Sequence, residues 1–216
     1  MEIDGRLRQS LHNAVRLTLG MERRDDAVSL PWEATWYEPE KPPQPLPAGT
    51  RVSEIFQKTK QQLLILGEPG AGKTTTMLEL ARDLLEKAKA DNTQPIPVLV
   101  SLSSWKEQKQ QKQEVGIFEW LAAELKAKYG LRQDIGKAWM QNRVLLPLLD
   151  GLDEVTPSLQ QKCAEAMNAW LTGDLEKQPC GVLVCCRREE FETIVRQKLD
   201  LQGAIYLQAL TPVQIE

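Results

Sequence analysis

The chain has 216 residues, of which 42% are hydrophobic and 26% are charged, and its formal net charge is -3. This composition is typical of a globular domain with a full core, and its slight acidity excludes a general attraction to nucleic acid, so we expect no direct nucleic-acid partner. No apolar run is as long as a membrane span and no signal peptide is present, so we expect a cytoplasmic protein with reduced cysteines and no membrane segment.

The N-terminal residues 1–45 are predicted to form an appendage to one globular domain. Apolar residues recur at helical spacing in residues 5–20, which indicates a weakly amphipathic helix. Residues 30–50 are dense in proline and aromatic side chains, a composition that favours an extended linker over helix or sheet. Binding of these prolines to an aromatic groove is the alternative. The main domain is then expected to cover residues 46–216.

From residue 61 onward, short apolar runs alternate with helical patterns. The predicted strands cover residues 61–66, 96–102, 144–150, 181–186 and 204–210. The predicted helices cover residues 73–90, 117–129, 134–142, a stretch that begins at Pro157, and a stretch with Phe191, Ile194, Val195 and Leu199. A solvated loop is predicted for residues 106–114. Continuous apolar strands that alternate with helices are typical of an α/β fold, with a five-stranded parallel sheet covered on both faces.

The stretch GEPGAGKTT directly follows the first predicted strand and opens the predicted helix 73–90. It fits the pattern of a P-loop, and its position between strand and helix separates a P-loop from a chance match; a glycine-rich turn with an exposed lysine is the alternative. Backbone N–H groups and the helix N-terminus suit phosphate oxygens, and Lys73 can reach the β- and γ-phosphates. The residues expected to bind the triphosphate are Gly67, Glu68, Pro69, Gly70, Ala71, Gly72, Lys73, Thr74 and Thr75.

The predicted strand 144–150 is followed by three carboxylates, on Asp150, Asp153 and Glu154. The Asp-Gly pair could form a hairpin turn, but the following residues have helical spacing, so a strand, a loop and a helix are expected. A P-loop needs a carboxylate on a neighbouring strand to hold Mg²⁺, so Asp150 and the Thr74 hydroxyl are the expected metal ligands. The next position holds glycine instead of a second carboxylate, so Asp153 or Glu154 must activate water.

The sequence DGLDE after an apolar strand resembles the NACHT family of STAND-class, signal-transducing P-loop ATPases. The resemblance covers roughly residues 46–216 and includes the stretches VLVSLSSW and VLVCCRRE. In length and general composition the chain is similar to cyanobacterial members. It implies an AAA+-like parallel sheet in the order 5-1-4-3-2 with helices on both faces. It further implies that Lys73 acts on the phosphates, that Asp153 is the base with Glu154 as the alternative, and that Arg187 senses the γ-phosphate.

Two features depart from the family pattern. Pro147 lies inside a predicted central strand, where it removes a backbone donor, so we expect a bulge or an unpaired neighbouring carbonyl. Family members also continue into a helical and a winged-helix domain, whereas this chain ends shortly after Thr211 and Pro212, which look like the start of a helix. The chain is therefore expected to be a piece of a longer protein.

The residues and the resemblance together predict Mg²⁺-dependent binding of ATP and ADP, or of GTP, with slow hydrolysis. The domain would be the nucleotide switch of a larger signal-transduction or defence protein, with effector and sensor domains in the same chain and nucleotide-dependent homo-oligomers of the full-length protein. One alternative is a small-molecule P-loop kinase or transferase, which should carry an arginine-rich lid. Another is an AAA+-like nucleic-acid remodelling ATPase, which should carry basic pore or groove segments. Neither feature stands out in the sequence.

Overall fold

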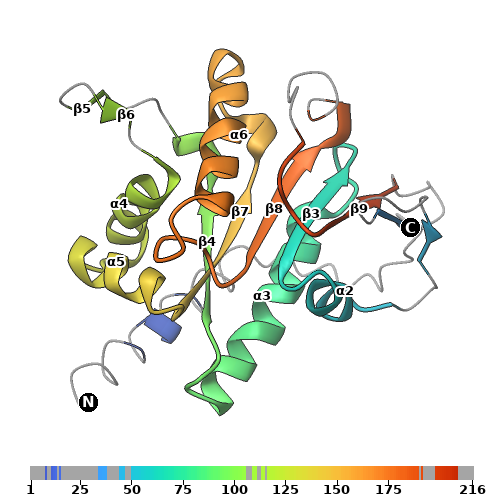
Figure 1. The fold of residues 1–216 in the computed structure, drawn as a ribbon. Helices are drawn as coiled ribbons and strands as arrows, with labels where there is room; N and C mark the ends of the chain where they lie inside the picture. Colours follow the sequence, from blue (N-terminus) through green and yellow to red (C-terminus); the bar gives the residue numbers. More distant parts are fainter. Residues whose placement is uncertain are drawn as a thin grey trace.

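The computed structural model describes residues 50–105, 116–189 and 198–208, together with Arg8, residues 11–13, Val15, residues 34–37, 44–46, 109–110, 113–114 and Phe191. These residues form a twisted sheet with helices against both of its faces (Figure 1). The buried apolar side chains of the strands and helices belong to one core cluster. The structure therefore has the layered α/β architecture that the sequence predicted.

The main sheet has seven strands in the order β2-β1-β9-β3-β8-β7-β4. Five of them are parallel, namely β3 (Gln62–Gly67), β4 (Ile96–Ser101), β7 (Leu145–Asp150), β8 (Val182–Arg187) and β9 (Gly203–Leu207). Numbered along the chain from β3, these strands lie in the order 5-1-4-3-2. The predicted fold class and strand order are therefore confirmed.

The helices divide between the two faces of the sheet because of the direction in which each connection crosses it. Helix α3 (Lys73–Ala90) leads from β3 across to the edge strand β4. Helices α4 (Ile117–Tyr129), α5 (Gln133–Gln141) and α6 (Pro157–Thr172) lie on connections that return from β4 to β7 and β8. Since parallel crossovers are right-handed, opposite directions place α3 on one face and the other three on the opposite face, as Figure 1 shows. Helix α2 (Val52–Lys58), which the sequence did not predict, packs beside α3.

The sheet extends past its parallel strands on the β9 side. Strand β1 (Ala34–Tyr37) pairs antiparallel with β9, and β2 (Gln44–Pro45) pairs antiparallel with β1. The prediction that this proline-rich stretch stays out of any sheet was therefore wrong for these residues. The physical reason is that β9 would otherwise expose a row of unpaired backbone groups, which an added edge ribbon satisfies.

Two predicted helices lie only partly within the described residues. In the segment 5–20, Leu11 and Val15 have helical geometry and are buried in the core, with exposed fractions of 3% and 0%. After β8, Phe191 is helical, whereas Leu199 is not. The structure does not describe most of the remaining residues of these two segments, among them Ile194 and Val195.

Strand β7 contains Pro147 without a bulge, which was one of the two features expected there. Each residue of β7 pairs one to one with a residue of β4. The Ile96 N–H donates to the Val144 carbonyl, so the backbone groups of Val144 point toward β4. Backbone groups of successive residues in a strand alternate between its two neighbours, so those of Pro147, three positions later, point toward β8. Pairing between β7 and β8 covers only Leu148 and Leu149. Pro147 therefore removes no hydrogen bond from the ladder with β4, because its nitrogen points toward β8. It removes none from the ladder with β8 either, because that pairing begins only after Pro147.

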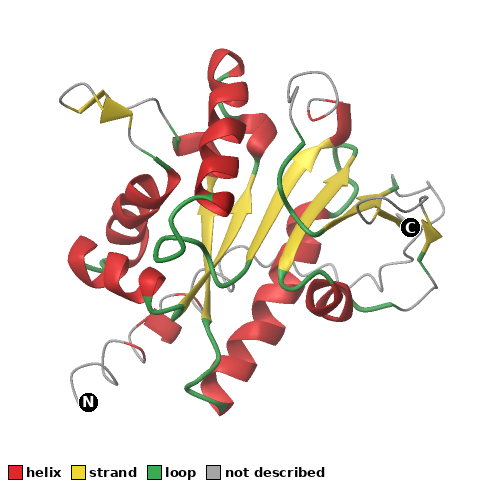
Figure 2. Cartoon of the chain, viewed as in Figure 1, coloured by secondary structure: helices red, strands yellow, loops and turns green. Residues whose placement is uncertain are grey.

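Residues 106–114 were predicted to be a solvated loop, and part of this stretch is a hairpin instead. Strands β5 (Lys109–Gln110) and β6 (Gln113–Glu114) pair antiparallel and form a second, two-stranded sheet. Figure 2 shows this hairpin apart from the main sheet. It contributes nothing to the parallel strands that carry the predicted functional residues.

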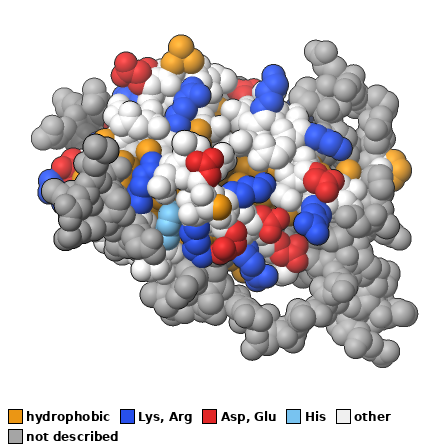
Figure 3. Space-filling model, turned by 90° about the horizontal axis from the view of Figure 1, so that it is seen from below, with side chains coloured by type: hydrophobic (Ala, Val, Ile, Leu, Met, Phe, Trp, Pro, Cys, Tyr) orange, Lys and Arg blue, Asp and Glu red, His pale blue; other side chains and the backbone are white. Residues whose placement is uncertain are grey.

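On the face drawn in Figure 3, Lys and Arg side chains are interspersed with Asp and Glu side chains. Among the described residues, Leu175 is the only exposed large hydrophobic residue, with 75% of its surface accessible. None of the described helices combines the length and the hydropathy needed to cross a membrane. All four cysteines are free, and burial raises the pKa of the Cys163 thiol to about 12.

Candidate functional site

Three parallel strands end with residues that the sequence marked as functional. Gly67 ends β3, Asp150 ends β7, and Arg187 ends β8, which lies between the other two strands. From β3 the chain crosses toward β4, whereas from β8 it continues to β9 on the other side of β3. Neighbouring strands whose connections leave in opposite directions open a crevice, which is the usual ligand site of an open α/β sheet.

The loop between β3 and α3 depends on its glycines. Gly70 and Gly72 have φ angles of 78° and 85°, in the left-handed region that other residues rarely adopt. A Cβ on Gly67 would lie 2.9 Å from the Leu207 carbonyl oxygen of β9, so this position has no room for a side chain. The first turn of α3 contains no acidic residue, so the positive end of the helix dipole is available to an anion. Of the remaining loop residues, Ala71 is buried, and the exposed ones are Pro69, Thr74 and Thr75.

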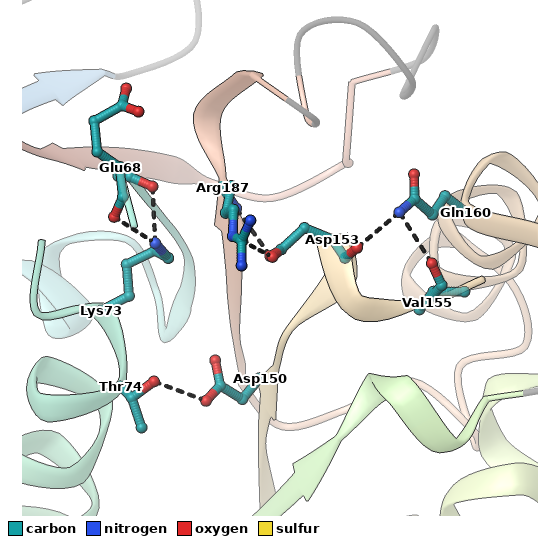
Figure 4. Close-up of polar contacts among 9 residues, drawn as sticks. Glu68, Lys73, Thr74, Asp150, Asp153, Val155, Gln160 and Arg187 are labelled. Carbon is teal, nitrogen blue, oxygen red and sulfur yellow. Dashed lines mark hydrogen bonds and ion pairs between the residues drawn. The ribbon is translucent and has the colours of Figure 1, made fainter. Parts of the chain in front are cut away.

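Lys73 is folded back over the loop in this structure. Its Nζ donates to the Gly67 carbonyl at 2.8 Å and to the Glu68 carbonyl at 2.9 Å (Figure 4). Both acceptors are neutral backbone groups, so these contacts leave the charge of the ammonium group uncompensated. A phosphate oxygen that entered the loop would be a stronger, charge-assisted acceptor for the same donor.

Thr74 and Asp150 meet across the crevice, although 76 positions of the chain separate them. The Thr74 hydroxyl donates to Asp150 Oδ2 at 3.0 Å. Burial raises the pKa of Asp150 above its ordinary value, and the charge of Asp153 adds to this, while the Thr74 hydrogen bond and Lys73 oppose it. A cation would relieve the cost of this buried carboxylate.

The donor set fits Mg²⁺ in the way expected of a P-loop site. Among the described residues, no group of three His, Cys, Asp or Glu side chains could hold a metal ion by itself. Mg²⁺ in phosphate-binding sites needs no such cage, because it takes one or two protein oxygens and completes its shell with phosphate oxygens and water. The hydroxyl of Thr74 and the carboxylate of Asp150 supply oxygens of this kind.

Asp153 and Arg187, predicted to be base and sensor, are bonded to each other. The Arg187 backbone N–H donates to Asp153 Oδ1 at 3.0 Å, and Arg187 Nε lies 3.0 Å from Oδ2. The Asp153 side chain is only 6% exposed, whereas that of Arg187 is 44% exposed. The amide of Gln160 donates to the Asp153 carbonyl at 2.8 Å and to the Val155 carbonyl at 3.0 Å, which holds the turn that carries Asp153.

Glu154 lies on the same 3-10 turn, η2 (Leu152–Glu154), but its surroundings differ from those of Asp153. Its carboxyl group folds back toward Gly151, where an added Cβ would lie 2.8 Å from Glu154 Cδ. Gly151 has a φ of 75° and starts this turn, which explains why glycine suits this position. Burial raises the pKa of Glu154, the charges of Asp150 and Asp153 add to this, and Arg187 opposes it.

Two residues next to the loop were not singled out by the sequence reasoning. The Tyr206 hydroxyl of β9 donates to Glu68 Oε1 at 3.1 Å. The Arg188 guanidinium lies over the Tyr206 ring, 4.7 Å from its centre. The strand order implied by the family resemblance places the fifth strand beside the first. A polar aromatic residue near the end of the fifth strand was therefore the signal that could have revealed the contact between Tyr206 and Glu68.

Comparison with known proteins identifies the family of the chain. A model of the NACHT domain matches residues 61–214. No curated protein matches the chain. Among solved structures, Cdc6p from Pyrobaculum aerophilum aligns with a TM-score of 0.43 and 12% sequence identity, over 76% of this chain and 45% of that chain. The Hsp104–ADP complex of S. cerevisiae aligns with a TM-score of 0.41 and 13% identity, over 76% of this chain and 32% of that chain. The chain thus spans less than half the length of either structure.

Proposed function

Because the chain belongs to the NACHT family, a family of nucleotide-binding P-loop NTPases, we propose that it binds ATP, or GTP, with Mg²⁺ and hydrolyses it slowly. The observation that carries this proposal is the contact between Thr74 and Asp150 at 3.0 Å, beside a glycine loop that opens α3. A hydroxyl and a half-buried carboxylate that meet at a helix N-terminus supply what a metal-bound triphosphate requires.

The loop residues would bind the phosphates and the metal. Lys73 Nζ would leave the Gly67 and Glu68 carbonyls, 2.8 Å and 2.9 Å away, and donate to β- and γ-phosphate oxygens. Thr74 and Asp150 would hold Mg²⁺, and Asp150 would then be fully ionised. When bound, the metal would neutralise charge that develops on the β- and γ-phosphates.

Hydrolysis would require the pair of Asp153 and Arg187 to separate. Arg187 is the more exposed partner, so its side chain can turn toward a γ-phosphate while Asp153 stays on its turn. Asp153 Oδ2 would then be able to accept a proton from the attacking water. Glu154, whose pKa is raised by burial and by the charges of Asp150 and Asp153, is the alternative base.

In the whole protein this domain would act as a nucleotide switch between effector and sensor domains of the same chain. The structure favours neither alternative function. A transferase would need a lid with arginine side chains over an acceptor, whereas Arg187 is bonded to Asp153 and Arg188 lies over the Tyr206 ring. A nucleic-acid remodelling enzyme would need a basic groove, whereas the face in Figure 3 mixes both signs of charge.

The experiment that tests the proposal is calorimetric titration of ATP and GTP with Mg²⁺ into the wild type and into Lys73→Ala. We expect Lys73→Ala to abolish measurable binding, because this side chain is the mobile cation over the phosphates. Lys137→Ala is the matched control, since Lys137 lies on α5 and pairs with Glu119 of α4 at 3.7 Å, away from the loop. Unchanged affinity in a folded Lys73→Ala variant would refute the assignment. Phosphate release with added DNA, and with phosphoryl acceptors, separates the two alternatives.

A further inference from the structure

The first residues of the phosphate-binding loop are braced by the neighbouring strand β9. Gly67 packs so closely against Leu207 that a Cβ would meet the Leu207 carbonyl oxygen at 2.9 Å. One position earlier in β9, the Tyr206 hydroxyl donates at 3.1 Å to Oε1 of Glu68, the residue that follows Gly67. In the parallel ladder of β3 and β9, Leu66 is paired with Tyr206 and Gly67 with Leu207, so the Tyr206 side chain reaches past the end of β3 to the first residue of the loop.

Glu68 is bonded at both of its ends. Its carboxylate accepts from Tyr206, and its backbone carbonyl accepts from Lys73 Nζ at 2.9 Å. Figure 4 shows the Glu68 carboxylate pointing away from Lys73 while the carbonyl faces the ammonium group. The orientation of this single residue therefore affects both where Lys73 rests and where a negative charge lies.

A carboxylate in this loop is a competitor of the nucleotide. A free Glu68 side chain could approach the Lys73 ammonium group and occupy it as an internal anion, and it would repel an entering triphosphate. The hydrogen bond from Tyr206 restrains the carboxylate on the β9 side. Arg188, 4.7 Å from the centre of the Tyr206 ring, keeps a positive charge on that same side.

We propose that Tyr206 is a positioning residue of the nucleotide site, which acts by holding the Glu68 carboxylate away from Lys73 and from the triphosphate. This inference rests on the proposed function, and it deepens that proposal by adding a residue that no phosphate touches. It makes the effect of Tyr206 conditional on the negative charge of Glu68.

The test is a double-mutant cycle of Tyr206→Phe and Glu68→Gln, measured as ATP affinity by calorimetry with Mg²⁺. Tyr206→Phe keeps the ring and removes the hydroxyl. We expect it to weaken ATP binding by about three- to tenfold, the range for losing one ordinary hydrogen bond at a partly exposed position. Glu68→Gln keeps the loop backbone, which is the part of Glu68 expected to face the phosphates, and removes only the competing charge, so it should bind ATP more tightly than the wild type. In the Glu68→Gln background, Tyr206→Phe should have little further effect, because no charge remains to be restrained.

Tyr129→Phe is the matched control. The Tyr129 hydroxyl bonds the backbone of Leu99 in β4, at the far edge of the sheet, so its loss should lower thermal stability without changing ATP affinity. A merely structural role for Tyr206 predicts the same cost in both Glu68 backgrounds, and that result would overturn the inference. Unchanged affinity of Tyr206→Phe would also overturn it. If Lys73→Ala abolishes binding while this cycle shows no coupling, only the role of Tyr206 fails and the proposed function stands.

Discussion

Asp150, Asp153 and Glu154 lie within five positions of the chain, yet each carboxylate has different surroundings. Asp150 accepts from the Thr74 hydroxyl, Asp153 is paired with Arg187, and Glu154 folds back toward Gly151. The difference arises because Asp150 ends a strand, whereas the other two lie on the following 3-10 turn. Neutral substitutions can therefore separate their roles.

Asp150→Asn should weaken the Mg²⁺ dependence of nucleotide binding, because the amide is a poorer metal ligand than a carboxylate. Without metal, the same variant should be more stable than the wild type at neutral pH. The folded-state pKa of Asp150 is raised above 3.8, so ionisation of its carboxyl group at higher pH costs the folded state stability. The wild type recovers this stability as the pH falls through the raised pKa toward 3.8. Thermal unfolding of both proteins in chelator from pH 7 to pH 3 measures this. A constant difference in melting temperature would contradict the buried-charge account.

Asp153→Asn should spare ATP binding and slow hydrolysis by about a hundredfold or more, which is the usual contribution of a general base. Binding should be spared because Asp153 contacts Arg187, and not the loop. Steady-state phosphate release, with ATP affinity measured in parallel, checks this. Glu154→Gln is the paired variant, and if it alone suppressed turnover, the roles of the two carboxylates would be exchanged.

At the scale of the element, the edge strand β4 is closed by a side chain instead of another strand. The Leu99 N–H donates to the Tyr129 hydroxyl, which in turn donates to the Leu99 carbonyl, both at 3.0 Å. Pro97, which faces the same open side of β4 as Leu99, has no N–H to offer. The last helical residue of α4 thus satisfies the backbone of a strand edge that could otherwise pair with another chain.

Tyr129→Phe should therefore destabilise the fold by roughly 1–3 kcal/mol, because it leaves the N–H and the carbonyl of a buried residue without their partner. Chemical denaturation measures the loss, and light scattering near the unfolding midpoint should show more aggregation than in the wild type. A stability equal to that of the wild type would mean that water replaces the hydroxyl at this edge.

At the scale of the whole molecule, few cations are available to stabilise a transferring phosphoryl group. Lys73 and Arg187 are the described residues expected to reach the γ-phosphate, and Arg187 is held by Asp153. Among the described residues, Leu175 is the one exposed large hydrophobic residue, so exposed large hydrophobic side chains form no cluster there.

We therefore expect this chain to turn over ATP well below the median enzyme rate of about ten per second and to be mainly monomeric. Slow turnover follows because hydrolysis in this fold depends on positioned charge. Phosphate release and light scattering on the purified chain measure the two quantities. Fast turnover by a stable oligomer would instead favour a metabolic NTPase over a switch.

The sequence by itself determined the features that depend on neighbouring residues. The spacing of apolar residues predicted α3 at residues 73–90 and located each parallel strand, because helical and extended periodicity are local properties. The glycine pattern located the loop, since Gly70 and Gly72 are needed for its left-handed backbone angles. The strand order could be stated in advance only through the family resemblance, and the structure confirmed it.

Only the tertiary structure decided which side chains meet. Tyr206 and Glu68 are 138 positions apart, and Arg187 and Asp153 are 34 apart, so no local pattern links either pair. Strand β1 was missed for the same reason, because it is only four residues long, a proline-rich segment follows it, and its stabilisation comes from the open edge of β9. Contacts of this kind follow from the order and register of the strands, which put residues distant in sequence at the same end of one sheet.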